Sequence, residues 1–210
     1  VRQWKETLTA AITLGAEHLS CYSLILEEGT LLYEQAENGT CAPLPDEDAV
    51  CEMDEVTLRM TQAAGYARYE VSNYAKPGKA CRHNIVYWEC EPYLGVGLSA
   101  HSDMDGRRFY NPSDWEAYMQ LAKSGSHARE QEGEGSREDR MFERMMMGLR
   151  QTRGVDCARF ERDFGVSPRQ VWNEQIGRFL ADGLLETAGD RLRLTARGMQ
   201  VMNSVLVDLL

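Results

Sequence analysis

The 210-residue sequence lacks the features by which metal clusters and membrane proteins are most easily found. It has no Cys-x-x-Cys pair and only four histidines, so it carries no zinc-like set of ligands. No apolar run approaches the roughly 18 residues of a membrane helix, and residues 1–10 have neither the basic nor the apolar segment of a signal peptide. The six scattered cysteines then predict free thiols in the reducing cytoplasm. Because the chain starts at Val1 without an initiator Met, we expect an earlier part of a longer protein to precede it.

Lysine is missing from residues 137–210, where twelve arginines stand against eleven acidic residues. The whole chain holds 23 basic and 33 acidic side chains, for a net charge of −10, so the negative charge lies in residues 1–136. A phosphate backbone needs a cationic footprint, and this acidic part therefore argues against broad nucleic-acid binding. The change in charge also predicts a domain boundary, which we expect in the Gly-, Ser- and charge-rich residues 124–136.

Residues 1–123 alternate helical and extended patterns, as is typical of a mixed α/β domain. We expect helices at 2–14, 49–64, 83–88 and 114–123, and strands at 18–26, 66–74, 93–104 and 107–111. The strand at 18–26 is expected to be buried, and residues 105–106 to form a tight turn. Asp46 or Asp48 is expected to cap the helix that follows it.

Residues 137–210 predict a second domain of three amphipathic helices, a β-hairpin and a closing helix, which is the order of a winged-helix domain. The expected helices are 137–150, 155–163, 168–181 and 196–209, and the expected strands are 184–187 and 191–194. Helix 168–181 offers only Arg169 and Arg178 as cations, and the wing offers Arg191 and Arg193. Docking to a protein or within the chain is therefore favoured over DNA binding.

The segment from Arg82 to Trp88 holds the first candidate binding site. His83 and Tyr87 are four residues apart, so on a helix they share one face. Imidazole is a common axial ligand for haem iron, and flanking aromatic rings suit a flat macrocycle. An alternative stays open, in which His83 and Asn84 cap the helix over a core contact of the two following aromatic residues.

Two further segments combine apolar runs with positions that a ligand could approach. Gly95 and Gly97 lie in an apolar run that ends at His101, and their missing side chains would permit a close approach to the backbone. The alternative is a bulge or a crowded strand. Residues 21–26 lead to carboxylates at 27–28, which in a parallel barrel would lie at the catalytic edge, although solvated loop carboxylates are the alternative.

A stronger signal comes from the order of nine segments along the chain. They are HLSCYSLILEEGT (18–30), LPDED (44–48), GYARYEVSNYAKPG (65–78), CRHNIVYW (81–88), YLGVGLSAHS (93–102), GRRFYN (106–111), FERMMMGLRQTRGVD (142–156), FLADGLLE (179–186) and LRLTARG (192–198). Together they resemble the C-terminal half of the coproporphyrinogen III oxidase-like radical-SAM family. The His-Asn-x-x-Tyr-Trp pattern at 83–88 resembles the HemW-type haem-chaperone branch of that family, and residues 28–30 suit the same branch.

The resemblance implies an α/β fragment of a radical-SAM partial TIM barrel, followed by a winged-helix-like C-terminal domain. The family's [4Fe–4S] cluster and S-adenosylmethionine depend on a C-x3-C-x2-C motif that this chain lacks, so we expect the chain by itself to be catalytically silent. By position, the resemblance puts Tyr22, Ser23, Leu24 and Ile25 near the adenosyl group. It puts His101 near the substrate or a second cofactor.

For function, the resemblance implies the C-terminal portion of a haem chaperone, with His83 as the ligand to haem iron and Tyr87 and Trp88 packing on the porphyrin. The alternative is an oxygen-independent coproporphyrinogen III oxidase, which decarboxylates a porphyrinogen. A winged-helix interaction or DNA-binding module is the second alternative. The expected partners are haem or a porphyrinogen and a haem-recipient protein, with no nucleic acid and no integral membrane segment. Apolar edges of an incomplete barrel would favour a dimer.

Overall fold

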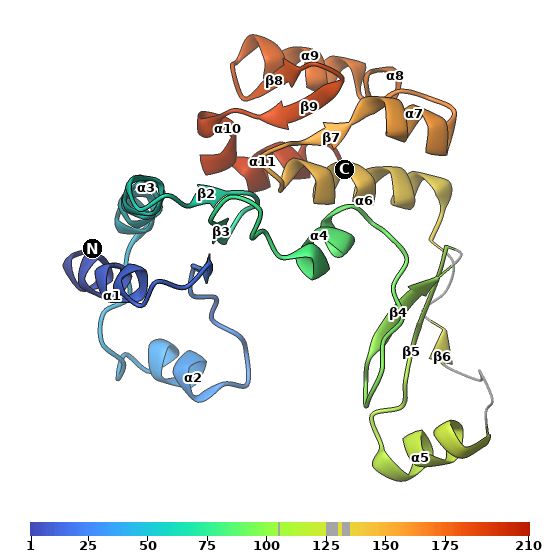
Figure 1. The fold of residues 1–210 in the computed structure, drawn as a ribbon, viewed down its shortest axis with the longest axis horizontal. Coiled ribbons are helices and arrows are strands. Elements are labelled where there is room, and N and C mark those ends of the chain that lie inside the picture. The colour runs from blue at the N-terminus through green and yellow to red at the C-terminus, as the bar shows by residue number, and fades with distance from the viewer. Residues whose placement is uncertain (105, 125–129, 132–134) are drawn as a thin grey trace. The chain divides into compact units, whose positions relative to one another are not determined.

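The computed structural model describes four stretches of the chain, which are residues 1–104, 106–124, 130–131 and 135–210. They form two compact units, Val1–Cys81 and Arg82–Leu210, and each unit is described by itself. Both units combine helices with short antiparallel strands, which confirms the predicted mixed α/β class (Figure 1). None of the described helices is both long and apolar enough to cross a membrane.

The first unit combines a pair of packed helices with a three-stranded sheet. Its elements are α1 (Arg2–Thr13), β1 (His18–Ser20), α2 (Leu31–Glu37), α3 (Glu47–Ala63), β2 (Ala67–Arg68) and β3 (Asn73–Ala75). Leu8 of α1 and Val56 of α3 are buried, and the indole Nε1 of Trp4 donates a hydrogen bond to Oγ1 of Thr57 at 2.7 Å. The strands pair antiparallel in the order β1-β3-β2. Helix α2 lies in a stretch where the sequence pattern predicts no helix.

The buried strand predicted at 18–26 is wrong beyond β1. Only the three residues of β1 pair with β3, and the apolar residues that follow form no strand and are exposed to solvent. Tyr22 is 70% exposed, Leu24 60% and Ile25 78%. An apolar run becomes a buried strand only where other elements cover both of its faces, and no described element of this unit does so here.

The single strand predicted at 66–74 is also wrong, because two strands joined by a turn occupy these residues. The amide of Tyr69 donates to the carbonyl of Asn73 at 3.1 Å across the turn. The guanidinium of Arg68 stabilises the turn, because its Nε donates to the carbonyl of Val71 at 3.0 Å. Its Nη1 also pairs with Asp54 of α3 at 3.1 Å. These contacts bend the chain where the sequence pattern alone predicts an extended run.

The second unit holds two three-stranded antiparallel sheets, in the orders β4-β5-β6 and β7-β9-β8. Its first elements are α4 (Arg82–Trp88), β4 (His101–Met104), β5 (Arg107–Tyr110), α5 (Trp115–Ser124) and β6 (Glu130–Gln131). The remaining elements are α6 (Arg137–Leu149), β7 (Val155–Asp156), α7 (Cys157–Phe164), α8 (Pro168–Val171), α9 (Asn173–Ala181), β8 (Leu185–Ala188), β9 (Arg191–Leu194), α10 (Ala196–Gln200) and α11 (Met202–Val207). One apolar core joins α6, α7, α9, α11 and the second sheet.

The single helices predicted at 168–181 and 196–209 are wrong, because each is split into two. Trp172 leaves the helical region with φ −121° and ψ 47°, and Val201 does so with φ −112° and ψ 23°. The Trp172 side chain is 7% exposed, and its Nε1 donates to the carbonyl of Leu209 at 2.9 Å. A tertiary contact therefore fixes the break, which helical periodicity does not reveal.

The glycine-interrupted strand predicted at 93–104 is regular only in β4, with an isolated bridge between Tyr93 and Asp103. The return strand is confirmed as β5. Part of the predicted turn at 105–106 and much of the predicted linker at 124–136 fall on residues outside the described ranges. The division into domains at 1–123 and 137–210 therefore stays a prediction.

Candidate functional site

Helix α4 brings His83 and Tyr87 onto one face, as their spacing predicts. The two ring centroids lie 4.9 Å apart, with the rings nearly perpendicular at 86°. Tyr87 in turn meets Tyr93 edge to face, with centroids 4.6 Å apart. Such perpendicular arrangements are the favoured geometry of aromatic pairs. His83, Tyr87 and Tyr93 thus form an aromatic row, with the exposed imidazole at its outer end.

Trp88 is the third residue that is predicted to bind haem. It follows His83 by five residues, so its side chain leaves the helix on another side. Among the described residues its ring forms no aromatic pair with His83 or Tyr87. Its carbonyl is occupied instead, because Nε2 of the buried Gln151 donates to it at 3.2 Å. Trp88 therefore ties α4 to the segment after α6.

The glycine segment after Tyr93 is crowded by the chain's own backbone. A Cβ at Gly95 would lie 2.2 Å from the carbonyl oxygen of His101. The Gly95 amide donates to Oγ of Ser102 at 3.0 Å, and Nδ2 of Asn111 donates to the carbonyl of Gly97 at 2.8 Å. At Gly95 the structure supports the crowded-strand alternative.

His101 lies on β4, where it is exposed and stacked on Tyr110 of β5. The ring centroids are 5.2 Å apart and the planes 28° from parallel, and the two residues pair directly across the strands. The backbone of Tyr93 exchanges hydrogen bonds of 2.8 and 2.9 Å with Asp103, two residues further along β4. The bridge between Tyr93 and Asp103 therefore connects the aromatic row with β4, the strand that carries His101.

In the first unit, three of the four predicted cofactor residues line one cavity of about 400 Å³. These residues are Tyr22, Ser23 and Leu24, and the rest of the lining comes mainly from α1, α3 and Tyr74. Ile25 is not part of the lining. The walls are largely apolar, and the volume suits a small organic ligand. Burial, followed by the charge of Asp54, raises the pKa of the Cys21 thiol at this cavity.

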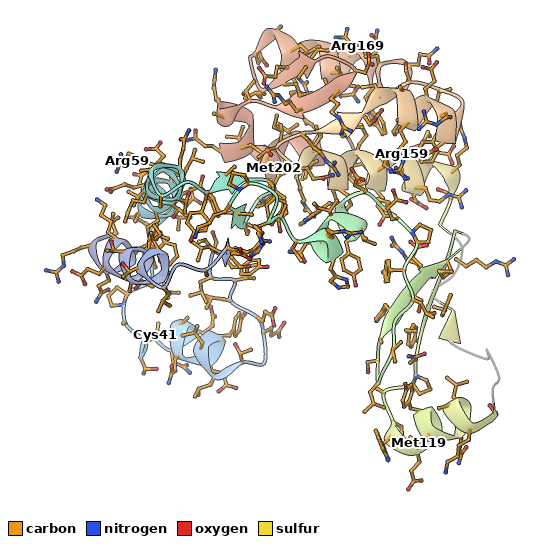
Figure 2. The ribbon with its side chains drawn as sticks, viewed as in Figure 1. Cys41, Arg59, Met119, Arg159, Arg169 and Met202 are labelled. Carbon is orange, nitrogen blue, oxygen red and sulfur yellow. The ribbon has the colours of Figure 1, made fainter. Side chains whose placement is uncertain are left out.

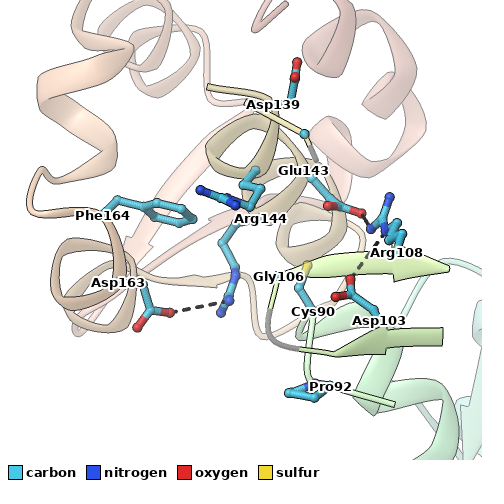
Figure 3. A pocket seen from close by; sticks show the side chains of 12 residues that line it. Cys90, Pro92, Asp103, Gly106, Arg108, Asp139, Glu143, Arg144, Asp163 and Phe164 are labelled. Atoms are coloured by element: carbon cyan, nitrogen blue, oxygen red, sulfur yellow. Dashed lines mark hydrogen bonds and ion pairs between the residues drawn. The ribbon is translucent and has the colours of Figure 1, made fainter. Parts of the chain in front are cut away.

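A second cavity, of about 330 Å³, lies between Cys90, the β4–β5 hairpin and α6 (Figure 3). Arg108 of the hairpin pairs with Asp103 at 3.4 Å and, at closer range, with Glu143 of α6. Arg144 of α6 pairs with Asp163 at 3.4 Å, and its buried Nε has no partner in the described part of the chain. Burial raises the pKa of the Cys90 thiol to about 11. Both guanidinium groups at this cavity already form ion pairs. The pair of Arg108 with Glu143 connects the hairpin to α6.

The described residues include no group of three or more His, Cys, Asp or Glu side chains that could hold a metal ion. Haem needs less from the protein, because the porphyrin supplies four ligands and the chain supplies one axial ligand. His83 fits that need, because its imidazole is exposed and packs edge to face against the ring of Tyr87. Tyr93 and Gln151 belong to this site without being predicted for it, although Tyr93 begins the YLGVGLSAHS segment.

Comparisons with known proteins agree along the whole chain. Residues 136–201 match the family model described as "HemN C-terminal domain". The "Heme chaperone HemW" of Bacillus subtilis is 31% identical over 205 residues, which cover 98% of this chain and 54% of that protein. HemW of Escherichia coli is 33% identical, covering 95% and 51%. The mouse "Radical S-adenosyl methionine domain-containing protein 1, mitochondrial" is 32% identical, covering 100% and 50%.

A solved structure shares the fold. The coproporphyrinogen III oxidase HemN of Escherichia coli, described as a radical SAM enzyme, superimposes with a TM-score of 0.69 at 17% identity. The match covers 97% of this chain and 50% of the HemN chain. The chain thus spans about half the length of the relatives that it matches.

Proposed function

Because the chain belongs to the coproporphyrinogen III oxidase-like radical-SAM family, with HemW haem chaperones among its relatives, we propose that it is the C-terminal portion of a haem chaperone. His83 is the axial ligand to haem iron, and Tyr87 packs against the porphyrin. The part that Trp88 plays there stays a prediction, because its side chain leaves α4 on another side than His83. One observation carries this proposal: His83 is exposed at the end of an aromatic row whose next ring stands 4.9 Å away and perpendicular to it. The imidazole is thereby held at the surface, where a large flat ligand can reach it.

The experiment is a titration of the chain with ferric haem, followed by the Soret band. We expect a Soret shift that His83→Ala removes. His18→Gln is the matched control, because His18 lies in the first unit and its Nε2 bonds the hydroxyl of Tyr69 at 2.8 Å. A shift that survives in His83→Ala would rule out His83 as the ligand.

For the first unit we propose a part in binding S-adenosylmethionine within a partial TIM barrel. Support comes from the cavity lined by Tyr22, Ser23 and Leu24 and from the likeness to the HemN fold. Ile25 would join them only when a further element approaches it, since it is 78% exposed. When bound, S-adenosylmethionine and a [4Fe–4S] cluster supply radical chemistry, and this chain contributes no cluster motif. His101 would face the substrate or a second cofactor. Isothermal titration with S-adenosylmethionine should show binding that Leu24→Asp weakens.

For residues 137–210 we propose a winged-helix-like domain used for docking. The antiparallel order β7-β9-β8 around α7, α8 and α9 supports this architecture. The two wing arginines are already paired, Arg191 with Asp156 at 3.2 Å and Arg193 with Glu186 at 2.7 Å. Cations neutralised in this way have little to offer a phosphate backbone. This favours docking over the DNA-binding alternative.

The coproporphyrinogen III oxidase alternative has the support of a shared fold, while several of the sequence relatives carry the chaperone name. Anaerobic incubation of the longer protein, reconstituted with iron and sulfide, with S-adenosylmethionine, a reductant, an electron acceptor and coproporphyrinogen separates the two, because only the oxidase releases carbon dioxide. The remaining parts of the proposal are a cytoplasmic location, a haem-recipient protein as partner, and a dimer through the exposed residues near Leu24.

A further inference from the structure

The end of α4 has an unusual geometry for residues of its type. The amide of Cys90 donates to the carbonyl of Tyr87 at 3.0 Å, and the amide of Glu91 donates to that of Val86 at 2.9 Å. This pair of bonds is a Schellman ending, which places Cys90 where glycine normally stands. Cys90 indeed has a positive φ of 49°. A residue with a side chain adopts this conformation at a cost, so surrounding contacts must hold it there.

Three side chains from residues 151–159 supply such contacts. Nε2 of Gln151 donates to the carbonyl of Trp88 at 3.2 Å, which satisfies one of the carbonyls left open at a helix end. Arg153 forms a close ion pair with Glu89. Arg159 of α7, labelled in Figure 2, pairs with Glu91 at 2.6 Å and reaches Glu89 at 3.8 Å.

These contacts form one connected network. Oε1 of Gln151 accepts a hydrogen bond of 2.9 Å from Nε of Arg153, so the two residues support each other. Gln151 is 4% exposed, and the side chains of Arg159 and Glu89 are 26% and 24% exposed. Half-buried, shared charges of this kind are screened less by water and salt than isolated surface pairs.

Helix α4 depends on such support because it cannot be stable alone. It has seven residues, fewer than the roughly twelve that an isolated helix needs, and none of them is fully buried. The contact of Tyr87 with Tyr93 supports the helix. Its carboxyl end is held by the side chains of Gln151, Arg153 and Arg159.

We propose that Gln151, Arg153 and Arg159 are positioning residues, which hold the end of α4 and thereby fix the direction in which His83 meets haem. The inference rests on the proposed haem function. It gives residues 137–210 a defined task, namely to clamp the haem-binding helix from within the same chain. We call these three residues the α4 clamp.

The test compares Arg159→Ala with Arg178→Ala in the 210-residue chain. Arg178 is a matched control, since it also pairs with a carboxylate, Asp208 at 2.5 Å, but does so away from α4. Two quantities are measured: hydrogen exchange of the amides of residues 89–91, and the rate at which bound haem passes to an apoglobin. Arg159→Lys keeps the charge and tests for rescue, and thermal unfolding verifies that each variant folds.

We expect amides 89–91 of Arg159→Ala to exchange about tenfold faster and haem to leave several-fold faster, since a hydrogen bond to a charged group is lost. Arg178→Ala should change neither rate, and Arg159→Lys should recover part of both. An unchanged exchange rate in Arg159→Ala would overturn the clamp, whatever the rate of haem transfer. Faster exchange with an unaltered haem rate would overturn the positioning role. If the unaltered chain binds no haem, the proposed function fails and the positioning role fails with it, while exchange still reports on the clamp itself.

Discussion

Gly154 lies in the turn that joins α6 to β7, immediately after the first two residues of the α4 clamp. Its φ of +73° lies in the left-handed region, and a Cβ there would come within 2.3 Å of the carbonyl oxygen of Leu192 and 2.4 Å of Cβ of Arg193. Gly165 has a nearly identical φ of +71°, yet a Cβ at that position would meet no atom within 4 Å. The two glycines therefore separate backbone conformation from crowding.

Alanine in the left-handed region loses about 1–2 kcal/mol, and this loss applies to both Gly154→Ala and Gly165→Ala. Overpacking adds about 1–3 kcal/mol, and it applies to Gly154→Ala alone because β9 presents rigid backbone at that point. We expect Gly165→Ala to lower the free energy of unfolding by about 1–2 kcal/mol and Gly154→Ala by about 2–5 kcal/mol.

Urea unfolding of the two variants, monitored by circular dichroism at equal protein concentration, measures this difference. Gly154→Ala should also raise the exchange rate of amides 89–91, because the displaced turn carries Gln151 and Arg153. Equal losses of stability in the two variants would contradict a crowding effect at Gly154, since β9 would then accommodate the added methyl group at no cost.

Three further predictions concern Cys90 and the start of α7. Cys90→Gly should be more stable than Cys90→Ala by about 1 kcal/mol in urea unfolding, because only glycine relieves the positive φ, and the opposite order would show that this backbone is unstrained. Burial favours the neutral thiol of Cys90 and raises its pKa from 9.0 to about 11, so its contribution to stability is complete below pH 9 and is lost as the pH rises to 11. The unaltered chain should therefore lose more stability than Cys90→Ala between pH 8 and 11, and equal losses would contradict the burial of the thiol. Asp156→Ala should cost about 1–2 kcal/mol, because Asp156 caps α7 by accepting from the amide of Arg159 at 2.9 Å, and Asp156→Asn should recover most of that loss.

Signals confined to a few neighbouring residues predict local structure well in this chain. Asp46 caps α3 by accepting from the amide of Ala49 at 2.8 Å, as its position before the helix indicates. A cap depends on a side chain and an amide three residues away, so the sequence contains the whole interaction. The break at Trp172 depends on the carbonyl of Leu209, which lies 37 residues further along, and local periodicity therefore misses it.

At the candidate site, too, the sequence predicts the local contacts and misses the long-range ones. The face shared by His83 and Tyr87 follows from a spacing of four residues, and the structure confirms it. The contact of Gln151 with Trp88 joins residues 63 apart, and that of Arg159 with Glu91 joins residues 68 apart. No helical or strand period reports such pairs. The glycine at position 95 shows a related limit, because its need for a close backbone approach is visible in the sequence but the approaching partner is not.

The strain at Cys90 and the α4 clamp explain each other. A positive φ at a residue other than glycine costs about 1–2 kcal/mol, which a seven-residue helix does not supply by itself. The hydrogen bond from Gln151 contributes about 0.5–1.5 kcal/mol, and the partly exposed ion pairs of Arg159 add about 0.2–1 kcal/mol. Together these contacts are enough to hold α4 in a conformation that its own residues would not keep. At the proposed haem site the His-Asn-x-x-Tyr-Trp sequence would supply the ligand, and residues 151–159 would decide the direction in which that ligand is presented.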